Sequence, residues 1–282
     1  MLSTPFFIIG NPRSGTSLLR LMLNSHPEIT VPPECGFSLW LAPKFSDMED
    51  FNESAYLKFA DNVAKSKKFE TWGVPSKLVL ENIMKFRPER YSEMAACVYH
   101  AYGEFFNKNP RSLGDKNNYY INHLGEIDQF FPGAQKIFII RDGRDVACSY
   151  IDILSKKINS TYKPKLPSTI SEMASEWSLN AAKAIEREKE QGVLIVKYEN
   201  LIENPNGILR EVCSSLGVGF SSEMLSYYQK NDEPTDFMQW KSKTFEPVDK
   251  KNHGQYKRIL TKDQINEFEK HAFVNLEYFN YL

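Results

Sequence analysis

Residues 5–17, PFFIIGNPRSGTS, carry the clearest signal of the fold in this sequence. The apolar run FFII is typical of a strand that is buried on both faces. The residues from 16 to 25 follow as a helix that ends before Pro27. Between strand and helix, Gly10 and Gly15 have the GxxxxG spacing of a phosphate-binding loop, whose backbone N–H groups and helix dipole attract anions. We therefore expect an anion-binding loop at 10–17 (the glycine loop), the alternative being an ordinary strand-to-helix turn.

The glycine loop departs from the loop of nucleotide hydrolases at one position. Those enzymes need a lysine that reaches the outer phosphates, and this chain has Thr16 in its place. Arg13 offers a cation instead, because a guanidinium can bind a tetrahedral anion through two N–H groups at once. The loop is thus expected to hold a phosphate or sulfate group without cleaving ATP or GTP.

The rest of the chain alternates strand and helix patterns. Apolar runs predict strands at 136–140 and 193–196, and a further short strand is expected at 111–115. Helical patterns follow these strands at about 122–131, from 143 onward and at about 171–190. Such alternation is typical of a parallel sheet that helices cover on both faces. We predict a single α/β domain over 1–282, of the three-layer P-loop type, with a mostly helical insertion at 36–108.

The composition of the 282 residues excludes several classes of protein. Hydrophobic residues make up 41% and charged residues 25%, which excludes a largely disordered chain. The net charge is −1, so no bulk charge attracts nucleic acid or an anionic membrane. No apolar run approaches the roughly 18 residues of a membrane span, and the start lacks a signal-peptide pattern. Because the four cysteines are scattered and form no CxxC pair, we expect a cytoplasmic, reducing environment.

A second candidate anion site follows the strand at 136–140. Arg141 ends this strand, and Ser149 lies about two helical turns later on a similar side of the next helix. A guanidinium and a hydroxyl in these places can hold a phosphate from two directions. The alternatives are an ion pair of Arg141 with Asp142 or Asp145 and a solvated or back-bonded Ser149.

Three segments in order, PRSGTSLLR, RDGRDVACSY and VKYENLIENP, resemble the sulfotransferase family, whose members use 3′-phosphoadenosine 5′-phosphosulfate as donor. The resemblance is closest to the tyrosylprotein and carbohydrate branch, because HPE follows the RSGT core. It implies that five residues of the glycine loop hold the 5′-phosphosulfate: Arg13, Ser14, Gly15, Thr16 and Ser17. It also implies that Arg141 and Ser149 bind the 3′-phosphate and that Tyr198 lies beside the adenine. For Tyr198 the alternative is a half-buried tyrosine at a strand end.

A basic loop near the carboxyl end, KKNHG at 250–254, is a further candidate. Related enzymes often close the donor site with a basic loop at this stage of the chain. The resemblance therefore implies that Lys251 and Gly254 contact the donor. A solvated, charged loop is an equally open alternative.

The resemblance also suggests which residues carry the reaction. Counting from RSGT through HPE places the branch's general base on Glu34 and its lysine at the later strand end on Lys116, with Arg13 and Ser17 assisting. The alternative for Glu34 is a residue at the first turn of the next helix, where a carboxylate is favourable. Asp115 and His123 are the fallback bases.

These residues predict an enzyme that transfers a sulfuryl group to a hydroxyl or an amine with a glutamate base. Two alternatives stay open, a non-catalytic nucleotide-binding module of the same fold and a P-loop kinase of small molecules. No spacing of His, Cys or acidic residues predicts a metal site. The acceptor is a small molecule, carbohydrate, lipid or peptide, and the insertion at 36–108 is expected on its side of the site. The sequence does not determine the oligomeric state.

Overall fold

The computed structural model of the protein describes residues 2–282, apart from the side chains of Asp236 and Met238. Its centre is a five-stranded sheet in the order β2-β3-β1-β4-β5, in which all neighbouring strands are parallel. The strands are β1 Phe6–Gly10, β2 Ile29–Thr30, β3 Ser112–Lys116, β4 Lys136–Ile140 and β5 Val193–Lys197. The predicted α/β fold around a parallel sheet is confirmed. The sequence missed β2, because two residues are too few to form a pattern.

The register of the strands brings their carboxyl ends to one edge of the sheet. Strand β1 lies in the middle, with Ile8 opposite Lys116 of β3 and Gly10 opposite Ile139 of β4. The segments that follow β1, β3, β4 and β5 therefore meet at this edge. In open parallel sheets, ligands bind at the carboxyl ends of the strands.

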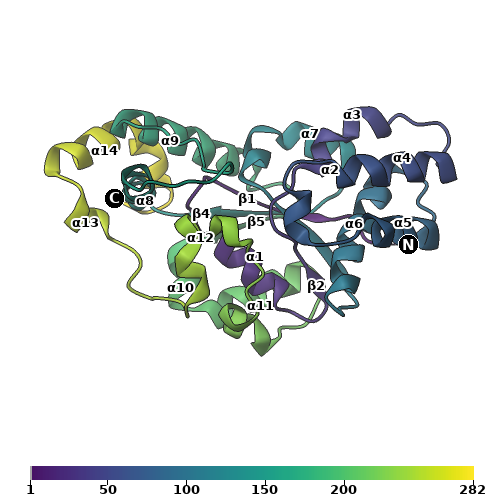
Figure 1. Ribbon diagram of the computed structural model, residues 1–282. Helices are drawn as coiled ribbons and strands as arrows, with labels where there is room; N and C mark the ends of the chain where they lie inside the picture. The colour runs from purple at the N-terminus through teal and green to yellow at the C-terminus, as the bar shows by residue number, and fades with distance from the viewer. Residues whose placement is uncertain (1) are drawn as a thin grey trace.

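Alternate residues of the strands face two separate hydrophobic cores, as the two-residue period of a strand requires. Phe6 and Ile8 belong to one core, and Phe7 and Ile9 belong to the other. The first core is covered by α1 Thr16–Asn24, α10 Tyr198–Glu203, α11 Pro205–Ser215 and η3 Ser222–Lys230. The second is covered by α7 Leu124–Phe130, α8 Gly143–Ser155, α9 Ile170–Arg187 and α14 Lys262–Tyr278, and by the helical insertion (Figure 1). Helices on both faces complete the three predicted layers.

The insertion at 36–108 is mostly helical, as predicted. Its helices are α2 Phe37–Trp40, α3 Ala42–Phe45, α4 Glu53–Ala64, η1 Phe69–Trp72, α5 Ser76–Phe86 and α6 Tyr91–Phe105. Buried aromatic rings hold these short helices together. The ring centroid of Phe37 lies 6.5 Å from that of Phe59, 6.0 Å from Trp72 and 5.3 Å from Tyr99.

Several helix bounds differ from the prediction. The helix expected at about 122–131 is α7, which begins at Leu124 and ends at Phe130, and a 3₁₀ turn, η2 Asn118–Asn122, precedes it. Helix α9 begins where Thr169 and Glu172 form a reciprocal capping box. The last part of the chain contains η4 Thr235–Phe237, α12 Met238–Lys241, η5 Ser242–Phe245 and α13 Tyr256–Ile259 before α14. Within residues 2–282, no helix is both long and apolar enough to cross a membrane.

The glycine loop turns sharply between β1 and α1. Gly15, the N-cap of α1, has φ 100°, and no side chain caps the helix there. A Cβ atom at Gly15 would overlap the ring of Tyr198. The loop therefore needs glycine at this position for two reasons, the left-handed backbone and the close approach of Tyr198.

We predict that Gly15→Ala lowers the free energy of unfolding by about 3 kcal/mol, because strain at positive φ adds to overpacking. Gly217→Ala is the matched control, since Gly217 has φ 70° but nothing lies within 4 Å of its Cβ position. That variant should lose only about 1 kcal/mol. Urea denaturation measures both values, and equal losses would contradict the proposed crowding by Tyr198.

Candidate functional site

The glycine loop presents polar groups that its own fold does not satisfy. The backbone N–H of Ser14 donates to Asn11 O at 3.1 Å, and Thr16 Oγ1 donates to Asn118 Oδ1 at 3.1 Å. In contrast, Ser14 Oγ is buried without a hydrogen-bond partner, and the same holds for Arg141 Nε. Thr30 Oγ1 is the third such atom among the described residues. Since buried polar groups normally have partners, two of these three atoms indicate an anion site at the sheet edge.

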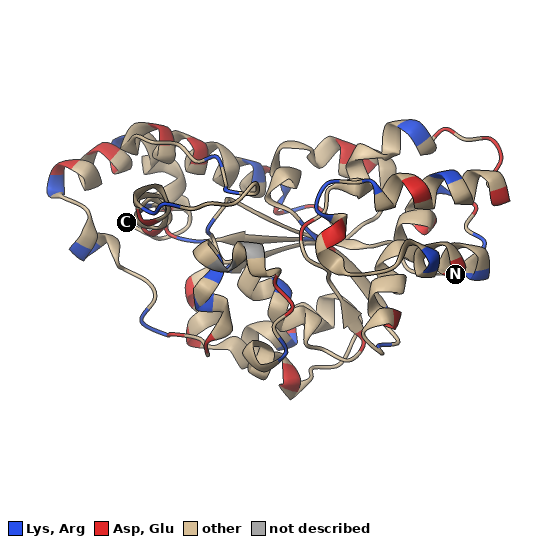
Figure 2. Cartoon of the chain, in the orientation of Figure 1, with Lys and Arg blue, Asp and Glu red and all other residues tan. Residues whose placement is uncertain are grey.

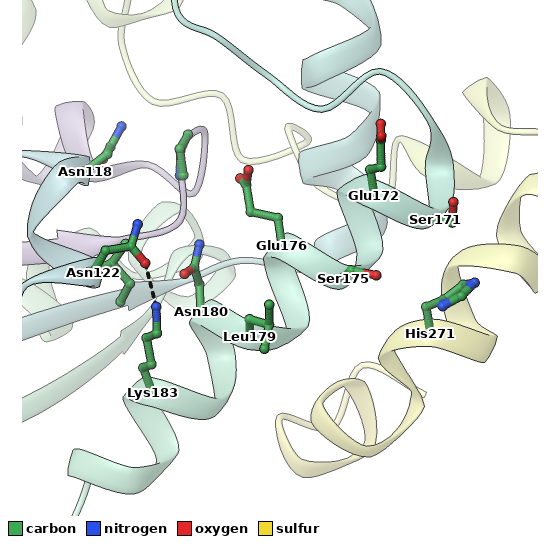
Figure 3. A pocket seen from close by; sticks show the side chains of 12 residues that line it. Asn118, Asn122, Ser171, Glu172, Ser175, Glu176, Leu179, Asn180, Lys183 and His271 are labelled. Atoms are coloured by element: carbon green, nitrogen blue, oxygen red, sulfur yellow. Dashed lines mark hydrogen bonds between the residues drawn. The ribbon is translucent and has the colours of Figure 1, made fainter.

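Asn11 fixes the glycine loop from behind. Its Nδ2 donates to Tyr150 OH at 2.9 Å, and Asn180 Nδ2 donates to Asn11 Oδ1 at 2.7 Å. Tyr150 OH in turn donates to Glu176 at 2.6 Å. Figure 3 shows Glu176 and Asn180 projecting from α9 into a cavity of about 590 Å³ beside the loop. Glu176 and Asn180 are engaged by Tyr150 and Asn11, so this side of the loop supports it from behind.

A larger cavity, of about 640 Å³, lies on the other side of the glycine loop. It brings together most of the residues that the sequence predicted: Arg13, Gly15, Thr16, Ser17, Glu34, Arg141, Ser149 and Tyr198. Ser14 and Lys116 are buried directly behind this lining. Residues that the sequence did not predict complete the walls, among them Lys68, Tyr162, Phe237, Trp240, Lys241 and Asn252.

Two arginines meet at the end of this cavity that Tyr198 borders. Arg13 Nε donates to Ser149 Oγ at 3.0 Å, and Arg141 Nη1 donates to the carbonyl of Arg13 at 3.4 Å. The guanidinium of Arg141 lies 4.6 Å from the ring centroid of Tyr198. Burial and, after it, the neighbouring charge of Arg141 lower the pKa of Arg13 to about 10. Two cations held together in this way favour an anionic ligand.

Arg141 also lies 3.6 Å from Asp145 Oδ2, the ion pair that the sequence left as an alternative. Arg141 therefore forms this ion pair, and it still lines the same cavity as Ser149. Asp142 instead caps α8, where its side chain accepts from the N–H of Arg144. Asp145 also anchors the carboxyl-terminal loop, because it accepts from the N–H of Gly254 at 2.7 Å.

The basic loop at 250–254 reaches the cavity through a residue that the sequence did not single out. Asn252 Nδ2 donates to Tyr198 OH at 2.7 Å, and Asn252 O accepts from Arg141 Nη2 at 3.1 Å. The side chain of Lys251 is exposed and does not line the cavity. Gly254 contributes only its N–H, to Asp145. An asparagine in a charged loop carries no sequence signal, so Asn252 could not be found before the fold was known.

At the opposite end of the cavity, Glu34 and Lys116 form a charged centre. Lys116 Nζ lies 2.5 Å from Glu34 Oε1 and 3.2 Å from Ser17 Oγ, and its side chain has 0% exposure. Glu34 lies between β2 and α2, before the Gly36 N-cap, so it is not in the first turn of a helix. This pair therefore connects the segment after β2 to the end of β3 and to the glycine loop.

Two lysines that the sequence missed also face Glu34. Lys68 Nζ lies 2.9 Å from Glu34 Oε2, and Lys241 Nζ lies 3.9 Å from Oε1. Burial alone would raise the pKa of the Glu34 carboxyl, but the charges of Lys116, Lys241 and Lys68 outweigh it and hold this pKa well below its ordinary value. Burial lowers the pKa of Lys116 to about 8, although Glu34 opposes the shift. The centre thus holds an ionised carboxylate among three cations.

The fallback bases lie outside the cavity. Asp115 accepts from Ser38 Oγ at 3.0 Å and from the hydroxyls of Tyr99 and Tyr120. Burial raises the pKa of Asp115 to about 6 despite these hydrogen bonds. His123 stacks on another aromatic ring, and its Nδ1 lies 2.7 Å from Glu126. Neither residue lines the cavity.

The positive charge at the site is local. Figure 2 shows Lys and Arg interspersed with Asp and Glu over the helices of the whole view, in accord with the net charge of −1. The described residues contain no group of three His, Cys, Asp or Glu side chains that could hold a metal ion. The four cysteines are buried free thiols. Any anion at the site is therefore held by the arginines, lysines and N–H groups described above.

Several curated proteins are similar to this chain over most of its length. The chain is 26% identical over 233 residues to protein-tyrosine sulfotransferase A of Caenorhabditis elegans, which covers 80% of this chain and 53% of the relative. It is 26% identical to the protein-tyrosine sulfotransferase of Drosophila melanogaster, over 81% of this chain and 41% of the relative. The nodulation protein NoeE of Sinorhizobium fredii is 25% identical over 75% of this chain and 49% of its own length. The chain thus spans about half the length of these curated relatives.

Solved structures have the same fold. The sulfotransferase domain of the Synechococcus PCC 7002 olefin synthase superposes with a TM-score of 0.61 at 20% identity, over 96% of each chain. A mouse sulfotransferase complexed with PAP gives a TM-score of 0.53 at 13% identity, over 97% of this chain and 84% of the other. The family model described as "Sulfotransferase family" matches residues 5–222. Because this match covers most of the chain, the protein belongs to the sulfotransferase family, as its motifs predicted.

Proposed function

We propose that the protein transfers a sulfuryl group from 3′-phosphoadenosine 5′-phosphosulfate to a hydroxyl or an amine of an acceptor. The observation that carries this proposal is the cavity of about 640 Å³, which has an arginine pair at one end and an ionised Glu34 among lysines at the other. The glycine loop lies between the two ends. Membership of the family and the names of the relatives support the same activity.

The described residues fit a donor with two separate phosphate positions. The N–H groups at the start of α1, together with Arg13 and the unsatisfied Ser14 Oγ, suit the 5′-phosphosulfate. Arg141, whose Nε is also unsatisfied, and Ser149 suit the 3′-phosphate. The face of Tyr198 beside Arg141 suits the adenine. Asn252 would hold Tyr198 in place through their hydrogen bond.

The donor supplies an activated sulfuryl group, and the residues around Glu34 supply the rest of the chemistry. In our proposal, Glu34 accepts the proton of the acceptor hydroxyl while a bond forms from that oxygen to sulfur. The bond from sulfur to the bridging phosphate oxygen breaks, and Lys116 stabilises the charge that develops there. Lys116 can serve both ends, because it contacts Ser17 of the glycine loop as well as Glu34. Binding of the donor offers Lys116 a new anionic partner and so frees a lone pair of Glu34.

We propose the acceptor by its reacting group, a hydroxyl or an amine. The relatives named protein-tyrosine sulfotransferases favour a peptide tyrosine, and small molecules, carbohydrates and lipids are the alternatives. Around Glu34 the cavity is bordered by Tyr162, Phe237 and Trp240. Lys68 belongs to the helical insertion at 36–108 and lines the cavity. Lys68 Nζ lies 5.8 Å from the ring centroid of Tyr162 and 5.3 Å from that of Phe237, so we propose that the acceptor binds alongside this group.

Titration calorimetry tests the donor site. We expect micromolar binding of adenosine 3′,5′-bisphosphate, and Arg141→Ala should weaken it about 10- to 100-fold, the value of one or two hydrogen bonds to a charged group. The affinity for 5′-AMP, which lacks the 3′-phosphate, should change much less. Arg90→Ala is the control, because Arg90 is an exposed arginine paired with Glu93. Equal weakening of both nucleotides would remove Arg141 from the 3′ site, and a preference for ATP with magnesium would support the kinase alternative.

Glu34→Gln tests the base. The amide keeps the shape of the side chain but cannot accept the proton, so turnover should fall about 10²- to 10⁴-fold. Binding of adenosine 3′,5′-bisphosphate should remain within a few-fold of the wild type. Unchanged turnover would exclude Glu34 as the base. If the wild type binds the nucleotide but transfers nothing to any acceptor, the non-catalytic module is correct.

The pH dependence tests Lys116. Its pKa of about 8 means that the cation is lost as the pH rises through this value, so kcat/KM for the donor should fall above about pH 8. The low pKa of Glu34 means that no acidic limb should appear near neutral pH. In Lys116→Arg, whose guanidinium stays charged, any remaining activity should lack the alkaline limb. An alkaline limb that persists in this variant would assign the titration to another group.

A further inference from the structure

A chain of buried charges lies behind Glu34 and involves none of the residues proposed above for the reaction. Arg20 of α1 has 0% exposure and donates through Nε to Glu233 at 3.2 Å. The other carboxylate oxygen of Glu233 accepts from Lys241 Nζ of α12 at 2.8 Å. Lys241 Nζ then lies 3.9 Å from Glu34 Oε1. Two regions that are far apart in sequence, 20–34 and 233–241, thus align a cation with the candidate base.

The far end of this chain is fixed. Arg20 also donates to the carbonyl of Val31 at 3.1 Å and to Asp232 Oδ1 at 2.8 Å. Asp232 is held in turn by Asn24 Nδ2 at 2.7 Å. With all three of its nitrogens engaged, Arg20 leaves Glu233 no freedom to move, and Glu233 restrains Lys241. The ring centroid of Phe237 lies 4.8 Å from Lys241 Nζ and closes another side of the ammonium.

The distances distinguish this arrangement from an ordinary buried ion pair. Burying two charges is costly. Their attraction offsets this cost only when the geometry is good and further hydrogen bonds satisfy the remaining polar groups. Here Glu233 has two cationic partners, while Lys241 faces a second carboxylate at a distance too long for a hydrogen bond. The charge of Lys241 therefore acts on Glu34 without occupying its lone pairs, unlike the direct contacts from Lys116 and Lys68.

We propose that Lys241 is a positioning residue for the reaction, held beside Glu34 by Glu233, which Arg20 fixes. The inference rests on the proposed role of Glu34 as the base. When Lys116 turns toward the donor, Lys241 keeps Glu34 ionised and in place while leaving it able to accept a proton. Glu233 prevents Lys241 from closing onto Glu34 and blocking it.

The charges that face each carboxylate support this division of labour. Lys116 of β3, Lys68 before η1 and Lys241 of α12 face Glu34. Lys241 and Arg20 face Glu233, and they outweigh the effect of burial and lower its pKa to about 2. Both carboxylates are therefore ionised at neutral pH, and Lys241 is shared between them.

The pH profile of turnover separates a positioning role from a structural one. Lys241→Met removes one cation, so the ionised form of Glu34 loses stabilisation and its pKa rises. As the pH falls, activity should then be lost at a higher pH than in the wild type, and kcat should be lower by about tenfold. In Glu233→Gln, the released Lys241 should bind Glu34 directly and keep its carboxyl ionised. The kcat of this variant should fall, and no acidic limb should appear.

Two further variants complete the experiment. Glu233→Gln with Lys241→Met removes one charge of each sign, so it guards against an unpaired buried charge, and it should keep the acidic limb of Lys241→Met. Lys230→Met is the control, because Lys230 forms an exposed ion pair with Glu223 at 2.5 Å and should leave the profile unchanged. The affinity for adenosine 3′,5′-bisphosphate, measured by calorimetry, should stay within a few-fold of the wild type in all four variants.

The outcomes distinguish this inference from the proposed function. A wild-type pH profile and kcat in folded Lys241→Met, with turnover abolished in Glu34→Gln, would overturn the inference alone. Loss of the fold in both Lys241→Met and the double variant would also overturn it, since the chain would then be structural. If Glu34→Gln keeps full turnover, the base assignment fails and this inference fails with it.

Discussion

The ion pair between Glu34 and Lys116 is the interaction on which the site depends. Lys116 is fully buried at the end of β3, and a charge in that position needs a partner of opposite sign. Glu34 supplies it at 2.5 Å and thereby ties the segment after β2 to the centre of the sheet. Because Lys116 also contacts Ser17, the same pair fixes the distance between the candidate base and the glycine loop.

The burial of this pair has a chemical consequence. Three lysines make Glu34 a stable carboxylate and therefore, by itself, a weak base. Its basicity has to increase when a lysine is drawn away, and the anionic groups of a sulfate donor are suited to draw it. In the proposed mechanism, donor binding would thereby make the base available. Such coupling would favour transfer to the acceptor over loss of the sulfuryl group to water.

The fold also holds two site residues in backbone conformations that side chains seldom adopt. Arg13 has φ 71° and Lys68 has φ 73°, and both line the same cavity. A non-glycine residue at positive φ costs about 1–3 kcal/mol, so the surrounding structure has to impose it. For Lys68, the neighbouring contacts do so. The thiol of Cys35 donates to the carbonyl of Lys67 at 3.4 Å, and Trp72 Nε1 donates to Pro33 O at 2.9 Å. The helical insertion thereby carries a cation to Glu34.

The sequence by itself determined four of the five strands, the glycine loop and the strand-end arginine. Apolar runs such as KIFII carry a local signal, and the two glycines and Arg13 lie within six residues of one another. Family motifs extended this to Glu34, Lys116 and Tyr198, which the structure brings to one edge of the sheet. Only the tertiary structure decided that Lys68, Lys241 and Asn252 join them. Each lies in a short turn or loop without periodicity, and its partner is far away in the chain, so the contacts depend on packing between segments that no local pattern encodes.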